Sequence, residues 1–226
     1  MDQTVAREES FSAAHRGDAL VEQVHAQICQ ALLTGQWAPG DRLNISSLAA
    51  AMDVSATPVR EALSRLISDG ALRTDDKRAI CVPRLNRAEL EEIFDLRVLI
   101  EGELAEAAVA RISEVELADI RLIQKELVVA LNGHEYKEAL KLNARFHFRI
   151  YEAAGCPLAL KLARSLWVRI GPTMHFHYPL LDYTREGIRR HQQIIEQIRK
   201  RNGKGLRAAM IEDLKGSLAT IKLEQT

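Results

Sequence analysis

The sequence predicts a mainly α-helical protein in two parts: a small N-terminal unit of short helices and a hairpin, and a C-terminal antiparallel bundle of six helices. Up to residue 85, turn residues interrupt the helical spacing at short intervals, and two extended segments flank a polar turn. After residue 86, apolar residues recur at helical spacing over much longer stretches. We therefore expect a flexible tail at 1–16, a first domain at 17–85 and a second domain at 86–226.

Composition and cysteine usage favour a cytoplasmic protein. The chain has 226 residues, 47% of them hydrophobic, and a formal net charge of zero, which is ordinary for a globular protein. Cys29, Cys81 and Cys156 are odd in number and far apart, so they predict neither a disulfide framework nor a thiolate zinc site. No apolar run approaches the roughly 20 residues that cross a bilayer, and the polar N-terminal segment lacks the pattern of a targeting signal.

Turn residues delimit the elements expected in the first domain. Gly35 ends a first helix, and Gly70 ends a later helix in whose first turn Pro58 is harmless, because its missing N–H is not needed there. The polar string DDKRA is typical of a hairpin turn. The expected elements are helices at about 20–34 and 47–52, a helix from Ser55 or Thr57 to Gly70, and extended segments at 42–45, 72–74 and 80–83.

Two short helices joined by a tight turn and followed by a hairpin form a winged helix-turn-helix, whose second helix enters the major groove of DNA. Val59, Leu63 and Leu66 fall on one face of that helix and are expected to pack inward. The residues expected to face DNA from the other face and from the wing are Ser55, Thr57, Arg60, Ser64, Lys77 and Arg78. The alternative is a unit that makes only protein contacts, with Arg60 paired to a neighbouring acidic residue.

The second domain begins at a helix N-terminus that the sequence marks clearly. Asn86 and Glu89 have the spacing of a capping box. Gly171-Pro172 should kink the fourth helix, because proline removes a backbone hydrogen bond and clashes with the preceding turn. The six helices are expected at about 87–111, 114–132, 135–154, 157–177, 182–201 and 204–223.

Three strings stand out along the chain: LTGQWAPGDRL, SLAAAMDVSATPVREALSRLISDGAL and DLRVLIEGELAEAAVARI. They closely resemble the GntR family of transcriptional regulators, specifically its FadR-like branch with an FCD effector domain, and the resemblance extends over about 20–223. It implies a homodimer that binds a double-stranded DNA operator and changes its DNA affinity with a metabolite.

Two positions depart from the family's pattern. Ala56 stands where relatives usually have an arginine that contacts the operator, and Ala79 stands where the wing usually has a glycine. Residues 17–85 carry seven basic and eight acidic side chains, so we expect weak sequence-independent affinity for DNA.

Polar residues interrupt the apolar stripes of three helices in the second domain. Asn143 and His147 share the apolar face of the third helix, His191 lies on that of the fifth, and Asp213 borders that of the sixth. Pointed into one bundle, these donors would form a site for a divalent metal ion. The alternative is a metal-free set of hydrogen-bonded core residues in which Asp213 pairs with a histidine.

The resemblance also implies a metal, because family members hold one with a D/N-x-x-x-H string and two further histidines. The strings NARFH and RRHQQII match that pattern, but Asp213 replaces the last histidine. Zinc is the first choice because imidazole suits it, and the oxygen ligands also admit nickel, cobalt or manganese.

Arg97 lies on the inner stripe of the first bundle helix, where an unpaired guanidinium would be costly. We expect its partner to be either an anionic group of an effector or an internal acid such as Asp213, and the resemblance favours an organic acid effector. Arg169 is a weaker candidate for the effector pocket. Residues expected at packing or rim positions are Trp37, Trp167, His175 and His177.

These expectations describe a regulator that binds operator DNA and a small carboxylate and that does not associate with membranes. One alternative is a metal-dependent hydrolase or lyase that uses the two histidines and the carboxylate of the bundle. The sequence lacks a nucleophile elbow, an H-E-x-x-H string and a phosphate loop, which disfavours an enzyme. The other alternative is a regulator for which the metal itself is the signal.

Overall fold

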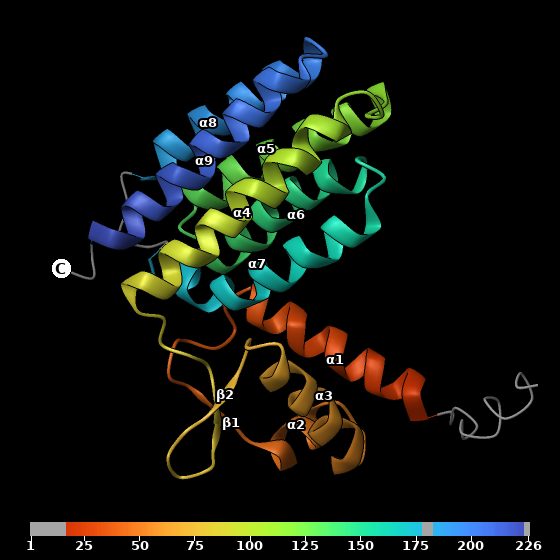
Figure 1. Ribbon diagram of the computed structural model, residues 1–226, viewed down its shortest axis with the longest axis vertical. Coiled ribbons are helices and arrows are strands. Elements are labelled where there is room, and N and C mark those ends of the chain that lie inside the picture. Colours follow the sequence, from red (N-terminus) through yellow and green to blue (C-terminus); the bar gives the residue numbers. More distant parts are fainter. Residues whose placement is uncertain (1–16, 178–182, 224–226) are drawn as a thin grey trace, which may run out of the picture.

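The computed structural model describes residues 17–177 and 183–223, and they form a helical bundle above a smaller mixed unit (Figure 1). The tail expected at 1–16 lies outside the described residues. The elements are α1 (Gly17–Leu33), β1 (Arg42–Leu43), α2 (Ile45–Ala51), α3 (Ala56–Ser68), β2 (Arg73–Thr74), β3 (Ile80–Cys81), α4 (Arg87–Ala108), α5 (Glu114–Asn132), α6 (Tyr136–Glu152), α7 (Pro157–His177), α8 (Tyr183–Arg199) and α9 (Gly203–Leu223). The expected class, a mainly α protein with a winged helix-turn-helix and a helical bundle, is confirmed.

The N-terminal unit packs three helices against a small antiparallel sheet with the strand order β1-β3-β2. Its second helix begins at Ile45, earlier than expected, because the side chain of Asn44 caps it by accepting a hydrogen bond from the backbone N–H of Ser47. The first strand is accordingly shorter than the expected segment 42–45. Ser55 is the N-cap of α3, although its side chain makes no capping hydrogen bond.

Capping boxes begin the first two helices of the bundle. The side chains of Asn86 and Ser113 each accept a hydrogen bond from the backbone three residues later, and Glu89 and Glu116 reach back to the cap residues. In the described bundle, α4 packs along α9, α5 along α6, and α8 along α9, around one core. The fourth bundle helix, α7, is assigned as one continuous helix through Pro172.

The two parts meet where α7 crosses α1, the helix that lies just below it in Figure 1. Val168 of α7 is buried in the core of the N-terminal unit, together with residues of α1 and α3. Gly171 allows the close crossing, because a Cβ there would lie 2.6 Å from the carbonyl oxygen of Leu32. The bundle therefore contributes directly to the packing of the N-terminal unit.

None of the helices in the described part of the chain is both long enough and apolar enough to cross a membrane.

Candidate functional site

The second helix of the helix-turn-helix, α3, has one buried and one exposed face. Val59, Leu63 and Leu66 are buried in the N-terminal core, as the spacing predicts. The residues predicted to face DNA from this helix, Ser55, Thr57, Arg60 and Ser64, are all exposed. Arg60 has no ion pair with any residue that the structure describes, so the internal pair considered for it is not found there. Its guanidinium is thus available to a base edge or a phosphate.

The wing is the hairpin between β2 and β3, and Asp75 organises its turn. This carboxylate accepts hydrogen bonds from the backbone N–H groups of Lys77 (2.9 Å) and Ala79 (2.8 Å) and from Arg42 (2.5 Å). The backbone hydrogen bond from Ala79 is the largest cause that lowers the pKa of Asp75 below its usual value. Lys77 and Arg78 remain exposed. The left-handed conformation falls at Arg78, with a φ of 61°, so Ala79 occupies a conformation that does not require glycine.

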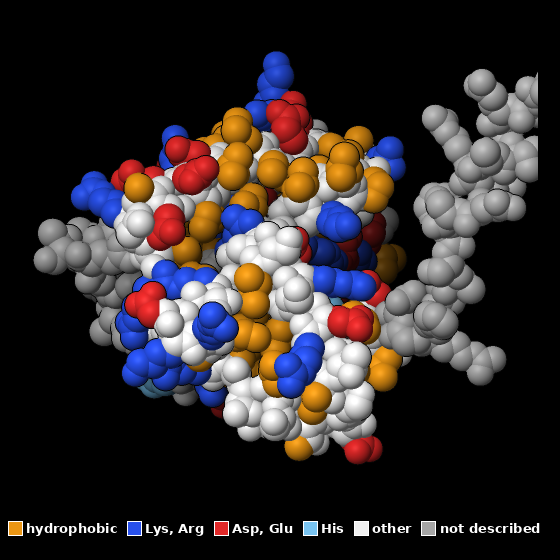
Figure 2. Space-filling view, turned by 60° about the horizontal axis from the view of Figure 1, so that its bottom comes forward, with side chains coloured by type: hydrophobic (Ala, Val, Ile, Leu, Met, Phe, Trp, Pro, Cys, Tyr) orange, Lys and Arg blue, Asp and Glu red, His pale blue; other side chains and the backbone are white. Residues whose placement is uncertain are grey.

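Figure 2 shows the end of the molecule that the winged helix forms. Lys and Arg side chains are more frequent than Asp and Glu side chains over the lower half of this face. The near-zero charge balance of the first domain therefore hides an uneven distribution. A basic face suits contact with a phosphate backbone, because local potential rather than net charge attracts the polyanion.

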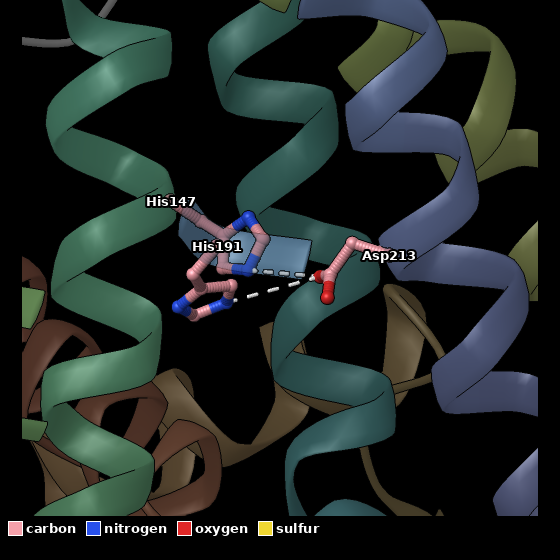
Figure 3. Close-up of side chains that lie close together, drawn as sticks. All are labelled: His147, His191 and Asp213. Carbon is pink, nitrogen blue, oxygen red and sulfur yellow. Dashed lines mark ion pairs between the residues drawn. The ribbon is translucent and has the colours of Figure 1, made fainter. Parts of the chain in front are cut away.

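Three predicted metal ligands meet in the core of the bundle (Figure 3). His147 comes from α6, His191 from α8 and Asp213 from α9, and each is at most 4% exposed. The Nε2 atoms of His147 and His191 lie 3.4 Å and 4.0 Å from Oδ2 of Asp213. One potential ligand atom from each residue lies within 4.8 Å of the others. Ligands about 2.0–2.2 Å from one ion lie roughly 3–4 Å apart, so the separations of both Nε2 atoms from Asp213 suit a divalent metal.

Hydrogen bonds fix the tautomers of both histidines. Nδ1 of His191 lies 2.7 Å from Oε1 of Gln124, a carbonyl oxygen, so it donates a proton there. Nδ1 of His147 lies 3.2 Å from the hydroxyl of Tyr151, which itself donates to Glu101 at 2.5 Å and therefore accepts from the imidazole. Both Nε2 atoms are left with lone pairs directed toward Asp213. A carboxylate repels a lone pair that faces it unless a cation lies between them, and in this tautomer Nε2 is free to bind a metal.

Burial and charge in the cluster set protonation states that suit a bound cation. Burial is the main reason why the pKa of His191 is lowered to about 3, so its imidazole is neutral at physiological pH. Burial alone would raise the pKa of Asp213, but its interactions with the two neighbouring imidazoles and with Arg190 lower it to about 2. Neutral imidazoles and an ionised carboxylate are the protonation states in which these groups bind metals.

Asn143 occupies the position that the NARFH string predicts, one helical turn before His147, and it is half-buried. The structure therefore keeps it on the same helix face as a fourth candidate ligand. Phe146 stacks on the ring of His191 with the centroids 4.1 Å apart, which holds that imidazole in place from a second side.

Arg97 is paired inside the protein rather than with Asp213. Its guanidinium makes a buried ion pair with Glu101, one turn later on α4, at 2.6 Å. The expected internal acid thus exists, but it is Glu101, because the i, i+4 spacing brings the carboxylate within reach on the same helix. Arg97 also stacks over the ring of Trp167, 4.4 Å from its centroid.

Arg169, the weaker candidate for the effector pocket, contacts the N-terminal unit in this structure, and its role in an effector pocket stays a prediction. Its guanidinium donates to the backbone carbonyl oxygen of Asp69, at the C-terminal end of α3. A cation is favourable at that end because the carbonyl groups of a helix C-terminus carry partial negative charge. The rim positions predicted for His175 and His177 fall outside the side chains that the structure describes.

The structure adds neighbours of the cluster that sequence reasoning missed. Arg190 on α8 lies 3.4 Å from Oδ1 of Asp213. Two buried N–H groups, Nε1 of Trp167 and Nε2 of Gln124, have no hydrogen-bond partner among the described residues. Trp167 packs as predicted, 5% exposed, against His147, while Trp37 packs at the edge of the N-terminal core. A buried donor without an acceptor costs about 1–3 kcal/mol, so each of these two donors needs an oxygen acceptor, which a water molecule or a ligand would supply.

The exposed recognition face and the separate helical bundle are the features of a DNA-binding regulator with a second, all-helical domain. The family model "Bacterial regulatory proteins, gntR family" matches residues 20–82, and the model "FCD domain" matches residues 92–216. The chain belongs to the GntR family of bacterial regulatory proteins and carries an FCD domain. It is a DNA-binding transcriptional regulator and not an enzyme.

Similar proteins cover nearly the whole chain. The HTH-type transcriptional regulator McbR of Escherichia coli K12 is 28% identical over 90% of this chain and 93% of its own length. A solved structure of McbR from E. coli has a TM-score of 0.85 and covers 92% of this chain and 99% of that one. The Nta operon transcriptional regulator of Aminobacter aminovorans is 34% identical over 58% of this chain and 62% of its own. A GntR regulator structure from Rhodococcus sp. RHA1, 20% identical with a TM-score of 0.74, shares the fold over 90% of this chain and 98% of that one.

Proposed function

We propose that this protein is a cytoplasmic homodimer that controls transcription by binding a palindromic operator, and that a small carboxylate bound beside a divalent metal changes its affinity for that operator. The exposed, unpaired recognition residues of α3 support the operator contact. One recognition helix covers too few base pairs for genomic specificity, so two copies should act together. Selection of bound duplexes from a random pool is expected to yield an inverted repeat, and sedimentation should give a dimer.

The metal part of the proposal rests on the Nε2 atoms of His147 and His191, whose lone pairs both face Asp213. With Asn143 as the fourth donor, these side chains would hold one divalent ion, zinc first, with nickel, cobalt or manganese as the alternatives. The ion would supply positive charge that attracts an anionic ligand. Metal analysis of untagged protein should find about one ion per chain in the wild type and a loss in His147→Ala and His191→Ala. His134→Asn, which removes an exposed histidine, is the matched control.

The effector part of the proposal rests on the buried N–H groups of Trp167 and Gln124, which have no hydrogen-bond partner among the described residues. The pair of Arg97 and Glu101 is neutral as a unit. The charges of Arg190 and a divalent ion together, in contrast, exceed those of Asp213 and Glu186, the two carboxylates with which Arg190 pairs. A carboxylate could offset this excess and accept from the indole of Trp167. Arg190 rather than Arg97 is thus our candidate for the anion contact.

Thermal unfolding with malate, succinate and citrate, each with and without zinc, tests the effector. A carboxylate that binds only the folded protein must raise the melting temperature, and malamide, the uncharged counterpart of malate, should not. Trp167→Phe should lose the shift, while Trp37→Phe should keep it. If zinc alone alters operator affinity and no carboxylate does, the metal itself is the signal.

A further inference from the structure

A crevice lies on the seam between the two domains, away from the metal cluster. Its walls come from α1 and α3 of the DNA-binding domain and from α7 of the bundle, and its volume is about 370 Å³. Sites for small molecules typically have volumes of roughly 300–1,000 Å³ and are lined mostly by apolar side chains. The crevice is therefore large enough for a small organic molecule.

The walls of this crevice are held in place by contacts between the domains. Arg169 of α7 is bonded to the carbonyl oxygen of Asp69 at the end of α3. Gly171 sits against the backbone of Leu32 and Leu33, with no room for a Cβ. These contacts fix α7 on both helices of the DNA-binding domain, so the cavity is formed before any ligand enters it, which lowers the cost of binding.

The lining is apolar at the floor and charged with both signs at the mouth. Leu66, Ala71 and Val168 line the crevice and are buried. Lys161 and Asp69 line it from exposed positions with opposite charges. A third charged residue of the lining, Arg164, is already paired with Glu152 at 2.6 Å. The charges at the mouth thus offset one another and favour neither an anion nor a cation.

Cys29 adds a soft, uncharged group to one wall. Its thiol lies 3.7 Å from Nδ1 of His25. Burial, with a smaller effect of the Asp69 charge, raises the pKa of this thiol to about 11. The group stays protonated at physiological pH, so it packs as a small polarisable surface and not as a nucleophile.

We infer that the crevice between α1, α3 and α7 is a second small-molecule site, for an uncharged and mainly apolar compound. Its chemistry differs from that of the metal cluster, which favours anions, and the inference does not depend on the proposed effector. Because both domains line the crevice, a bound compound stabilises the docked arrangement of the DNA-binding domain on the bundle.

Fluorine NMR on the full chain tests the site with three probes that share one ring: para-fluorobenzyl alcohol, para-fluorobenzoate and para-fluorobenzylamine. The alcohol is expected to bind saturably and more tightly than the two ions. Ala26→Trp, at an exposed position of the lining, should fill the crevice and weaken binding of the alcohol about tenfold or more. Gln27→Trp, on the next residue of the same helix, should leave it unchanged.

Several outcomes would overturn the inference. They are absence of saturable binding by the alcohol, equal affinity in Ala26→Trp and wild type, or tighter binding of either ion at this crevice. Loss of binding in His147→Ala would place the alcohol in the metal site instead. Melting curves of each variant show whether it folds, and since residue 26 is exposed we expect Ala26→Trp to fold normally.

Discussion

The recognition face of α3 and the buried cluster of the bundle place polar side chains in opposite surroundings. Thr57, Arg60 and Ser64 of α3 are exposed, and Arg60 has no ion pair with the described residues. His147, His191 and Asp213 are buried, and each contacts at least one other member of the cluster. The exposed residues can therefore be exchanged one at a time with little effect on folding, whereas each buried residue depends on its partners.

Arg60→Ala should give the largest effect on DNA binding without an effect on folding. If the guanidinium reaches a base edge, specific affinity should fall by about 1–3 kcal/mol. Anisotropy titration on the selected operator at fixed salt measures the change. Arg65→Ala is the matched control, because Arg65 lies on the same helix but pairs with Glu22 of α1. Equal losses in both variants would remove Arg60 from the recognition surface.

Acid should lower the free energy of unfolding through His191 of the buried cluster. The pKa of His191 in the folded protein, about 3, lies below its ordinary value of 6.5, so only the unfolded chain takes up this proton as the pH falls. The free energy of unfolding of the metal-free protein should therefore decrease by about 2 kcal/mol between pH 7.5 and pH 5 from this residue.

Urea unfolding at the two pH values measures this loss. His191→Asn, which cannot take up the proton, should reduce the pH dependence by that amount. His134→Asn removes an exposed histidine whose backbone has a positive φ of 57°, a conformation that asparagine tolerates. If the two variants have the same pH dependence, His191 does not contribute to the acid sensitivity.

Tyr151→Phe should weaken metal binding although Tyr151 is not a proposed ligand. The hydroxyl accepts the Nδ1 proton of His147 and fixes its tautomer, and loss of such a partner typically lowers metal affinity about 10–100-fold. Competition with a chelating dye gives the affinity. Tyr136→Phe removes a hydroxyl that contacts only the exposed His134 among the hydrogen bonds described, and it should have no effect. Unchanged affinity in Tyr151→Phe would mean that the hydroxyl does not orient the imidazole.

Ala56→Arg should produce the smallest change in DNA binding, and it should not affect the buried cluster. The new guanidinium at the start of α3 should add about one phosphate contact, which makes the slope of log affinity against log salt more negative by about 0.9. Ser68→Arg adds the same charge at the other end of α3 and separates a local contact from a general gain in charge. A slope that is unchanged in Ala56→Arg means that residue 56 does not approach DNA.

Local patterns predicted most of the helices and the identity of the cluster. Ser113 and Glu116 mark the start of α5, and the helix covers residues 114–132 as expected. The partner of Arg97 could also have been found, because Glu101 follows one turn later on the same stripe. The end of α4 was placed three residues too late, since the sequence there carries no glycine or proline to stop a helix.

The sequence by itself determined the order of the two domains, the recognition helix and three side chains of the buried cluster, because helical periodicity and capping depend on residues a few positions apart. Only the tertiary structure decided that Gln124 and Arg190 join the cluster and that Arg169 joins α7 to the end of α3. Those contacts depend on how one helix is rotated and shifted against another. That arrangement is set by the packing of the whole core, which no local pattern records.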